Sequence, residues 1–192
     1  MVIFEPEIIT IGGLGGTGTS SVGRALARAR KAEFFSCGDF VRAELKKRAG
    51  SVYEKRSSDL DSLVDSEVRS FGELPPDSRQ VVEGRLAWRF LPYSFKVLLV
   101  CPDSVRFRRI AERDGLASVE EAKSKTEKRE LLDAEHYRAL YEIREVCDPR
   151  QYDLVLRTGH EPVGRIVRRI VAHFIVRRYK GDSALLSSVR AA

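Results

Sequence analysis

The sequence predicts an α/β fold in three layers, with a central parallel sheet and helices on both of its faces. Short apolar runs alternate with longer segments of helical spacing along the chain, and this alternation is the order that builds parallel sheets. The runs are mostly apolar, as expected for strands buried on both faces. Ligands bind such folds at the carboxyl ends of the strands, so we expect the functional residues there.

Five short runs are predicted to be strands. They are rich in β-branched and aromatic residues, and turn-forming residues bound several of them. The clearest is VLLV at residues 97–100, which Pro102 ends because proline has no N–H to donate. The predicted strands lie at residues 8–11, 34–35, 81–84, 97–100 and 152–156.

Segments with helical spacing lie between these strands. Val22, Leu26 and Ala29 recur at helical intervals in the first of them. Asp103 is expected to cap the fourth, and the S-x-x-E sequence at 118–121 has the form of a capping box that opens the fifth. The predicted helices cover residues 20–32, 39–49, 58–71, 103–113, 118–146 and 163–174.

The composition is that of one basic domain. With 192 residues, a hydrophobic fraction of 43% and a net charge of +6, the chain can form one core and attract anionic ligands. Nucleic acid is disfavoured but stays open, because the arginines are not interleaved with aromatic residues. No run is long enough for a membrane span, no secretion signal is evident, and three scattered cysteines lack metal spacing. We therefore expect a cytoplasmic protein with one domain over 1–180 and a frayed tail over 181–192.

The glycine-rich turn after the first strand allows two interpretations. GLGGTG at 13–18 fits the G-x-G-x-x-G of dinucleotide sites, and GLGGTGTS at 13–20 fits the phosphate-binding P-loop with Thr19 in place of its lysine. A dinucleotide site needs an acidic residue after the second strand, but Glu33 precedes that strand. A P-loop needs a hydroxyl in the first helical turn to bind Mg²⁺, as Ser20 or Ser21 would supply. The pattern favours a P-loop and leaves a dinucleotide site or a plain turn open.

Several segments in order resemble the short archaeal-type cytidylate kinases, over about residues 8–175. The resemblance decides against the dinucleotide site and implies a P-loop fold with a helical lid over about 113–146 and monophosphate-binding helices over about 38–78. It also implies a monomeric or weakly dimeric enzyme that acts on small nucleotide substrates with ATP and Mg²⁺. The segments are IITIGG at 8–13, SCGDFVR at 36–42, VVEGRLA at 81–87, the stretches 106–113 and 129–137, and YDLVLRT at 152–158.

At the donor site, the resemblance implies that the glycine turn binds ATP. Backbone N–H groups of a P-loop converge on phosphate oxygens, and the positive end of the next helix points at them. Ser20 would bind Mg²⁺ directly, and Glu83 would hold a Mg²⁺-bound water. The expected ATP-binding residues are Gly13, Gly15, Gly16, Thr17, Gly18, Thr19, Ser20 and Ser21.

Thr19 is the departure from the P-loop pattern that bears on activity. Removing one preorganised charge stabiliser costs on the order of 10²–10³ in rate, roughly 3–4 kcal/mol. Arg24 or the arginines of the lid would replace the missing charge. Three alternatives stay open: a nucleotide binder without turnover, an RNA-binding protein, and a kinase for another small phosphorylated acceptor.

For the acceptor, the resemblance implies that two segments hold CMP or dCMP. Guanidinium groups suit a monophosphate dianion because they bind two of its oxygens at once. The expected substrate-binding residues are Ser36, Gly38, Arg42, Gly84 and Arg85.

Two helical faces in the lid region carry the expected catalytic residues. Arg106, Arg109 and Arg113 recur on one face, and Arg129, Asp133 and His136 share another. Asp133 would orient a guanidinium, and His136 stands where relatives carry a second arginine. Arg109, Arg129 and Asp133 are the expected catalytic residues.

Overall fold

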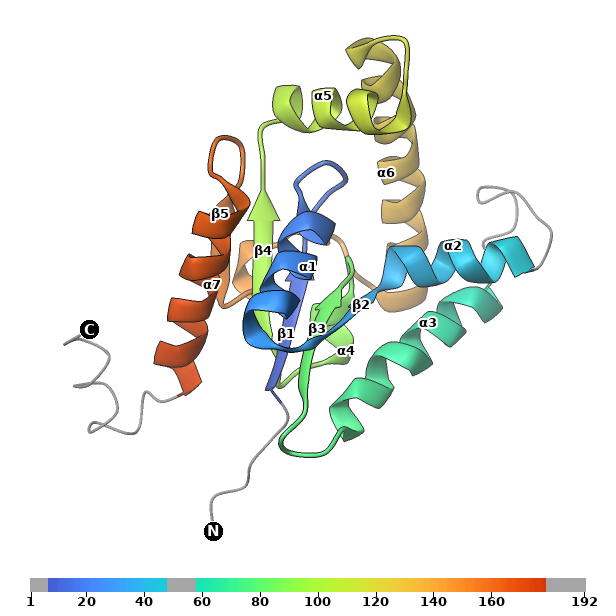
Figure 1. Ribbon diagram of the computed structural model, residues 1–192. Coiled ribbons are helices and arrows are strands. Elements are labelled where there is room, and N and C mark those ends of the chain that lie inside the picture. Colours follow the sequence, from blue (N-terminus) through green and yellow to red (C-terminus); the bar gives the residue numbers. More distant parts are fainter. Residues whose placement is uncertain (1–6, 48–57, 179–192) are drawn as a thin grey trace.

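The computed structural model describes residues 7–47 and 58–178, which form a three-layer α/β fold (Figure 1). Five parallel strands form one sheet in the order β2-β3-β1-β4-β5. All five predicted strands are confirmed, with small shifts at their ends. Their bounds are β1 (Glu7–Gly12), β2 (Glu33–Ser36), β3 (Arg79–Glu83), β4 (Phe95–Val100) and β5 (Leu154–Arg157).

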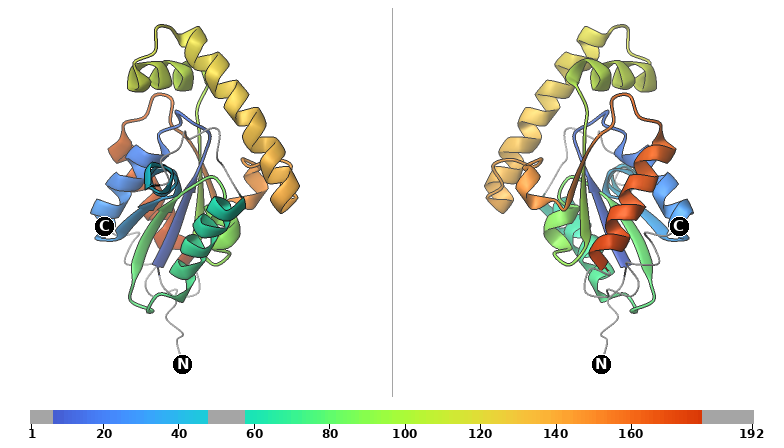
Figure 2. Two further views of the ribbon diagram at one scale, coloured as in Figure 1. Left: turned by 90° about the vertical axis from the view of Figure 1, so that its right-hand side faces the viewer. Right: turned by 90° about the vertical axis from the view of Figure 1, so that its left-hand side faces the viewer.

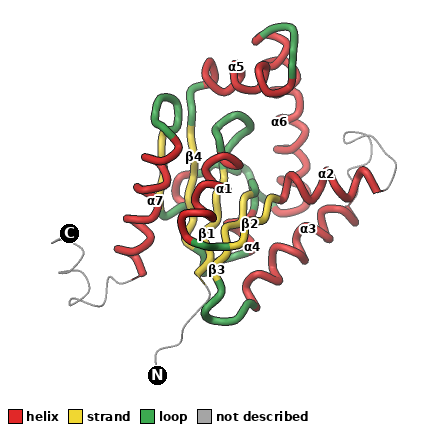
Figure 3. The backbone as a smooth tube through the Cα atoms, in the orientation of Figure 1, coloured by secondary structure: helices red, strands yellow, loops and turns green. Residues whose placement is uncertain are grey.

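The strand order places a topological switch point at β1. Ile9 of β1 pairs with Val81 of β3 on one side and with Phe95 of β4 on the other, so the chain changes direction across the sheet at this strand. Ligands of open parallel sheets bind at such switch points. The loops that follow β1, β4 and β5 gather at this end of the sheet (Figure 3).

Helices α1 (Thr19–Arg30) and α7 (Val163–Arg178) cover one face of the sheet (Figure 2). Leu26 of α1 and Ile170 of α7 are fully buried there against the sheet. The rings of Phe95 and Phe174 meet edge to face with centroids 5.7 Å apart, an arrangement that aromatic pairs favour. This layer fixes the start of α1, and with it the glycine turn.

The opposite face is covered by α3 (Ser58–Ser70), by α4 (Ala87–Phe90) and by the second half of α6 (Val119–Tyr141) (Figure 2). Val68 of α3 and Trp88 of α4 pack there with Val82 of the sheet. Helix α4 was not predicted, because four residues are too few to show helical spacing. Helix α2 (Cys37–Lys47) and the short helices η1 (Phe71–Glu73) and η2 (Pro149–Gln151) complete the described elements.

Helices α5 (Asp103–Asp114) and α6 (Val119–Tyr141) form an arm over the carboxyl ends of the strands (Figure 1). We call them the α5–α6 arm. Phe107 and Ile110 of α5 are buried against Ala122 of α6, so the arm has a small core of its own. None of the helices in the described ranges is long and apolar enough to cross a membrane.

The structure corrects two helix ends in this arm. Asp103 does not cap α5: Pro102 occupies the N-cap, and the Asp103 carboxylate accepts from Arg106 Nε at 2.7 Å instead. Helix α6 ends at Tyr141 rather than near residue 146, because Glu142 adopts the left-handed conformation that stops a helix. The predicted cap at Ser118 is confirmed, since its side chain accepts from the Glu121 N–H at 3.0 Å. The predicted end of the second helix and the predicted tail lie outside the described residues.

Glu142 is an exposed residue at φ +59°, where a Cβ costs roughly 1–2 kcal/mol. Replacing it by glycine removes that cost, and the greater freedom of glycine in the unfolded chain offsets part of the gain. We expect Glu142→Gly to raise the free energy of unfolding by about 0.5–1 kcal/mol in denaturant titrations. Glu142→Ala, which keeps the Cβ, should not stabilise the protein. Equal stabilisation by both variants would contradict the backbone explanation.

Candidate functional site

The glycine turn (residues 13–18) can be built only with glycine at two of its bends. Gly16 has φ +82°, and a Cβ on it would lie 2.5 Å from the Arg106 carbonyl oxygen. Gly18 has φ +90° with open space around it, so the conformation alone requires glycine there. The turn therefore lies directly against α5 and leads straight into the N-terminus of α1.

Three successive carbonyl oxygens of the turn each accept a hydrogen bond from a side chain. Arg106 Nη1 donates to Gly15 O at 3.1 Å, and Arg109 Nη1 donates to Gly16 O at 3.3 Å. Thr158 Oγ1, at the end of β5, donates to Thr17 O at 2.6 Å. We call these three bonds the carbonyl anchors.

The carbonyl anchors also fix where the amide groups of the turn point. In a planar trans peptide the N–H of the next residue points opposite to the carbonyl. The N–H groups of Gly16 and Gly18 therefore face away from the anchoring side chains, while the Thr17 N–H turns back to Leu14 O at 3.2 Å. Two amides beside the positive end of α1 can bind an anion.

Thr19, in the position of the P-loop lysine, donates its hydroxyl to a carboxylate. Its Oγ1 lies 2.7 Å from Glu83 Oε1, and Ser36 Oγ lies 2.6 Å from Glu83 Oε2. Glu83 ends β3 and Ser36 ends β2. One carboxylate thus joins the glycine turn to the segment predicted to bind the acceptor, and we call this contact the Glu83 bridge.

The five predicted acceptor residues do not all lie together. Ser36 is in the Glu83 bridge, and Gly84 follows it in tight contact with Cys37. Arg42 lies on the surface with 63% of its side chain exposed and is ion-paired to Asp39. Gly38 lies beside the Arg42 guanidinium, and Arg85 lies in a different, buried environment.

Arg85 is a mostly buried cation, with 15% of its side chain exposed, held by the arm. Its Nη1 donates to Asp133 of α6. Burial opposes the charge, but Asp133 outweighs it, so the pKa of Arg85 is raised. Arg129 Nε lies 3.6 Å from the same carboxylate. Asp133 therefore orients two guanidiniums, beside a cavity of about 230 Å³ that Leu14 of the glycine turn also lines.

The three arginines predicted on one face of α5 lie in different environments. Arg106 is 4% exposed, and Arg109 reaches the loop after β5, donating through Nη2 to Thr158 O at 2.9 Å. Arg113 is exposed and pairs with Asp114. His136 does not face these arginines: its Nε2 lies 2.6 Å from Asp61 Oδ2 on α3.

One contact residue of the site, Glu130, escaped the sequence analysis. Glu130 binds Arg106 through both carboxylate oxygens at 2.8 Å, and it has no distinguishing pattern among the charges of α6. Arg24, considered as a replacement for the lysine, pairs instead with Asp39 at 2.6 Å on the surface. Across the described residues no group of His, Cys, Asp and Glu has the arrangement of a metal site.

Gly84 is required by its neighbour rather than by its conformation. A Cβ there would lie 2.4 Å from Cys37 Sγ and 3.1 Å from Cys37 Cβ. We expect Gly84→Ala to lower the free energy of unfolding by about 1–3 kcal/mol, as overpacking does. Adding Cys37→Ala removes the Sγ contact and should restore part of the loss, which a double-mutant cycle in urea would measure. Strict additivity of the two changes would show that the contact is unimportant.

Comparison with known proteins identifies relatives over most of the chain. A model of the cytidylate kinase-like family matches residues 36–160. A cytidylate kinase of Methanothrix thermoacetophila is 35% identical over 157 residues, covering 79% of this chain and 88% of the relative. One from Pyrococcus abyssi is 35% identical over 172 residues, covering 86% and 94%.

Solved structures with the same fold are more distant in sequence. A shikimate kinase from Acinetobacter baumannii superimposes with a TM-score of 0.59 at 20% identity, covering 90% of this chain and 94% of that one. A gluconokinase from Sinorhizobium meliloti gives 0.59 at 17%, covering 94% and 98%. These likenesses bear on the fold alone and confirm the predicted three-layer α/β fold.

Proposed function

This chain belongs to the cytidylate kinase-like family, and we propose that it transfers the γ-phosphoryl group of ATP to CMP or dCMP. The observation that carries this proposal is the Glu83 bridge. One carboxylate accepts from Thr19, directly after the glycine turn, and from Ser36, in the segment proposed to hold the acceptor. Phosphoryl transfer needs this juxtaposition, because donor and acceptor must meet in line.

The residues of the donor side fit the triphosphate of ATP. The turn has a close-packed backbone, amides that face away from the carbonyl anchors, and the N-terminus of α1 behind it. Mg²⁺, when bound, neutralises charge on the phosphates. Ser20, exposed in the first turn of α1, would coordinate it, and Glu83 would hold one of its waters. Gly13, Gly15, Thr17 and Ser21 would complete the phosphate site.

On the acceptor side, Arg85 would bind the monophosphate. Its side chain is 15% exposed and permanently charged, and it donates to the Asp133 carboxylate. A phosphate dianion arriving at the cavity would share Arg85 with Asp133, since a guanidinium has five N–H donors. Ser36, Gly38 and Gly84 would shape the segment beside it. Arg42, now paired with Asp39, would join when the helices over 38–78 close.

The charge missing at Thr19 would come from Arg129. Arg106 and Arg109 donate to backbone carbonyls of the turn and are therefore committed there. Arg129 is half exposed and lies at a longer 3.6 Å from its carboxylate partner. Closure of the lid over 113–146 would exclude water and bring this guanidinium to the transferred group, where Arg109 would support it through the turn.

An acceptor panel tests the proposed reaction. Purified protein with ATP and Mg²⁺ is assayed for ADP release with CMP, dCMP, UMP, AMP and GMP. We expect the highest kcat/KM with CMP or dCMP. Preference for another acceptor would show that CMP is not the substrate. ATP binding without turnover of any acceptor would contradict the kinase proposal.

The Thr19 hydroxyl should matter for rate more than for binding. Thr19→Val keeps the shape but leaves Glu83 with one partner fewer, at a cost of roughly 1–3 kcal/mol. We expect kcat to fall about 10-fold, since 1.36 kcal/mol corresponds to that factor, with little change in the KM for CMP. Thr19→Ser retains the donor and should remain near the wild-type rate. Equal kcat values for the Val and Ser variants would show that the hydrogen bond from Thr19 to Glu83 does not contribute to the rate.

A further inference from the structure

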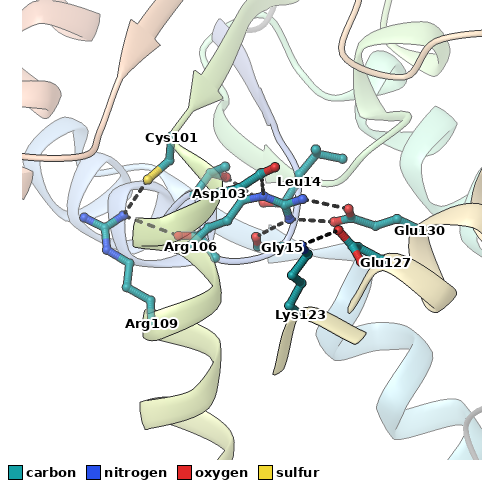
Figure 4. Close-up of polar contacts among 11 residues, drawn as sticks. Leu14, Gly15, Cys101, Asp103, Arg106, Arg109, Lys123, Glu127 and Glu130 are labelled. Carbon is teal, nitrogen blue, oxygen red and sulfur yellow. Dashed lines mark hydrogen bonds and ion pairs between the residues drawn. The ribbon is translucent and has the colours of Figure 1, made fainter. Parts of the chain in front are cut away.

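Arg106 occupies a buried position between the glycine turn and helix α6 (Figure 4). Its guanidinium binds both Glu130 oxygens at 2.8 Å and donates to Gly15 O at 3.1 Å. Its Nε donates to Asp103 at 2.7 Å. All of its nitrogens are therefore used, and one side chain connects α6 to the backbone of the turn.

Glu130 is the partner that keeps this cation in place. The Asp103 side chain is 69% exposed, whereas that of Glu130 is 16% exposed, so Glu130 interacts in the less screened environment. Burial opposes the charge of Arg106, but the hydrogen bonds to Glu130 and Asp103 outweigh it and raise its pKa. The guanidinium remains charged, and its position follows that of Glu130.

The glycine turn and α5 are closely packed, with no room for a side chain between them. A Cβ on Gly16 would lie 2.5 Å from the Arg106 carbonyl oxygen and 2.8 Å from its Cβ. The turn therefore touches both the backbone and the side chain of Arg106. A shift of Arg106 must move the Gly15 and Gly16 peptides, and with them the Gly16 N–H.

Glu130 and Asp133 lie three residues apart on α6 and so share one face of the helix. Asp133 binds Arg85, on the proposed acceptor side, and Glu130 binds Arg106, on the donor side. Both also line the cavity beside Leu14. One turn of helix thus contacts the binding groups of both nucleotides.

We propose that Glu130 is a positioning residue that acts through Arg106: it couples the acceptor site to the amides of the glycine turn. When acceptor phosphate binds Arg85, it competes with Asp133 for the guanidinium, and helix α6 shifts in response. Glu130, on the same face of α6, transmits this shift to Arg106 and so to the Gly15 peptide. Binding of each nucleotide then strengthens binding of the other, because coupling between sites is reciprocal. This inference rests on the proposed function.

The test measures that coupling directly. The affinity for AMP-PNP with Mg²⁺ is measured by calorimetry in the absence and presence of saturating CMP. In the wild-type protein we expect CMP to tighten AMP-PNP binding by at least about 5-fold, the lower end of typical coupling. In Glu130→Gln we expect this factor to fall to about 1.

Glu127 supplies a matched control, one turn earlier on α6. Its side chain is 53% exposed and pairs with Lys123 at 3.9 Å rather than with Arg106 (Figure 4). Glu127→Gln removes the same charge from the same helix, so a purely electrostatic effect of α6 would appear in both variants. We expect Glu127→Gln to keep the wild-type coupling factor.

Each other outcome contradicts the inference in a recognisable way. Absence of coupling in the wild-type protein, or undiminished coupling in Glu130→Gln, overturns it while leaving the kinase activity intact. Should Glu130→Gln fail to fold, Glu130→Asp keeps the charge but shortens the reach, and it must then show the reduced coupling. Failure of the wild-type protein to bind AMP-PNP or CMP at all would overturn the proposed function, and the inference with it.

Discussion

The carbonyl anchors are the constraint on which the site depends. A glycine-rich turn does not by itself keep its amides aligned, because glycine has more conformational freedom to lose on folding than any other residue. Arg106, Arg109 and Thr158 fix the turn by donating hydrogen bonds to three successive carbonyls. They come from the first helix of the arm and from the end of β5, so the turn is fixed from two sides of the sheet edge.

Thr19 changes the electrostatics of this arrangement. A lysine would add a mobile cation at the phosphates, whereas the threonine hydroxyl donates to Glu83 and connects the turn to Ser36. The turn therefore has one positive charge fewer than a P-loop with lysine, and it is linked through Glu83 to the end of β2. In the proposed function, closure of the α5–α6 arm would supply the cation that the glycine turn lacks.

The sequence predicted the sheet well because buried parallel strands leave a direct pattern of short apolar runs. It also predicted the glycine turn and the pairing of Asp133 with a guanidinium. It missed α4, which is too short for periodicity, and extended α6 beyond Glu142, whose left-handed backbone no propensity predicts. The sequence did not predict the contact of Glu130 or the ion-pair partners of Arg42 and Arg106. A sequence shows which face of a helix a residue lies on, but not which residue of another element it contacts.

The central claim is that the Gly16 and Gly18 amides bind the phosphates of ATP. The most direct measurement is the ¹H–¹⁵N spectrum of the glycine-labelled protein during titration with Mg·ATP. The account predicts large downfield shifts for the Gly16 and Gly18 N–H signals, and little change for Gly72, which lies in η1. Saturable binding of Mg·ATP with the Gly16 and Gly18 signals unmoved would contradict it.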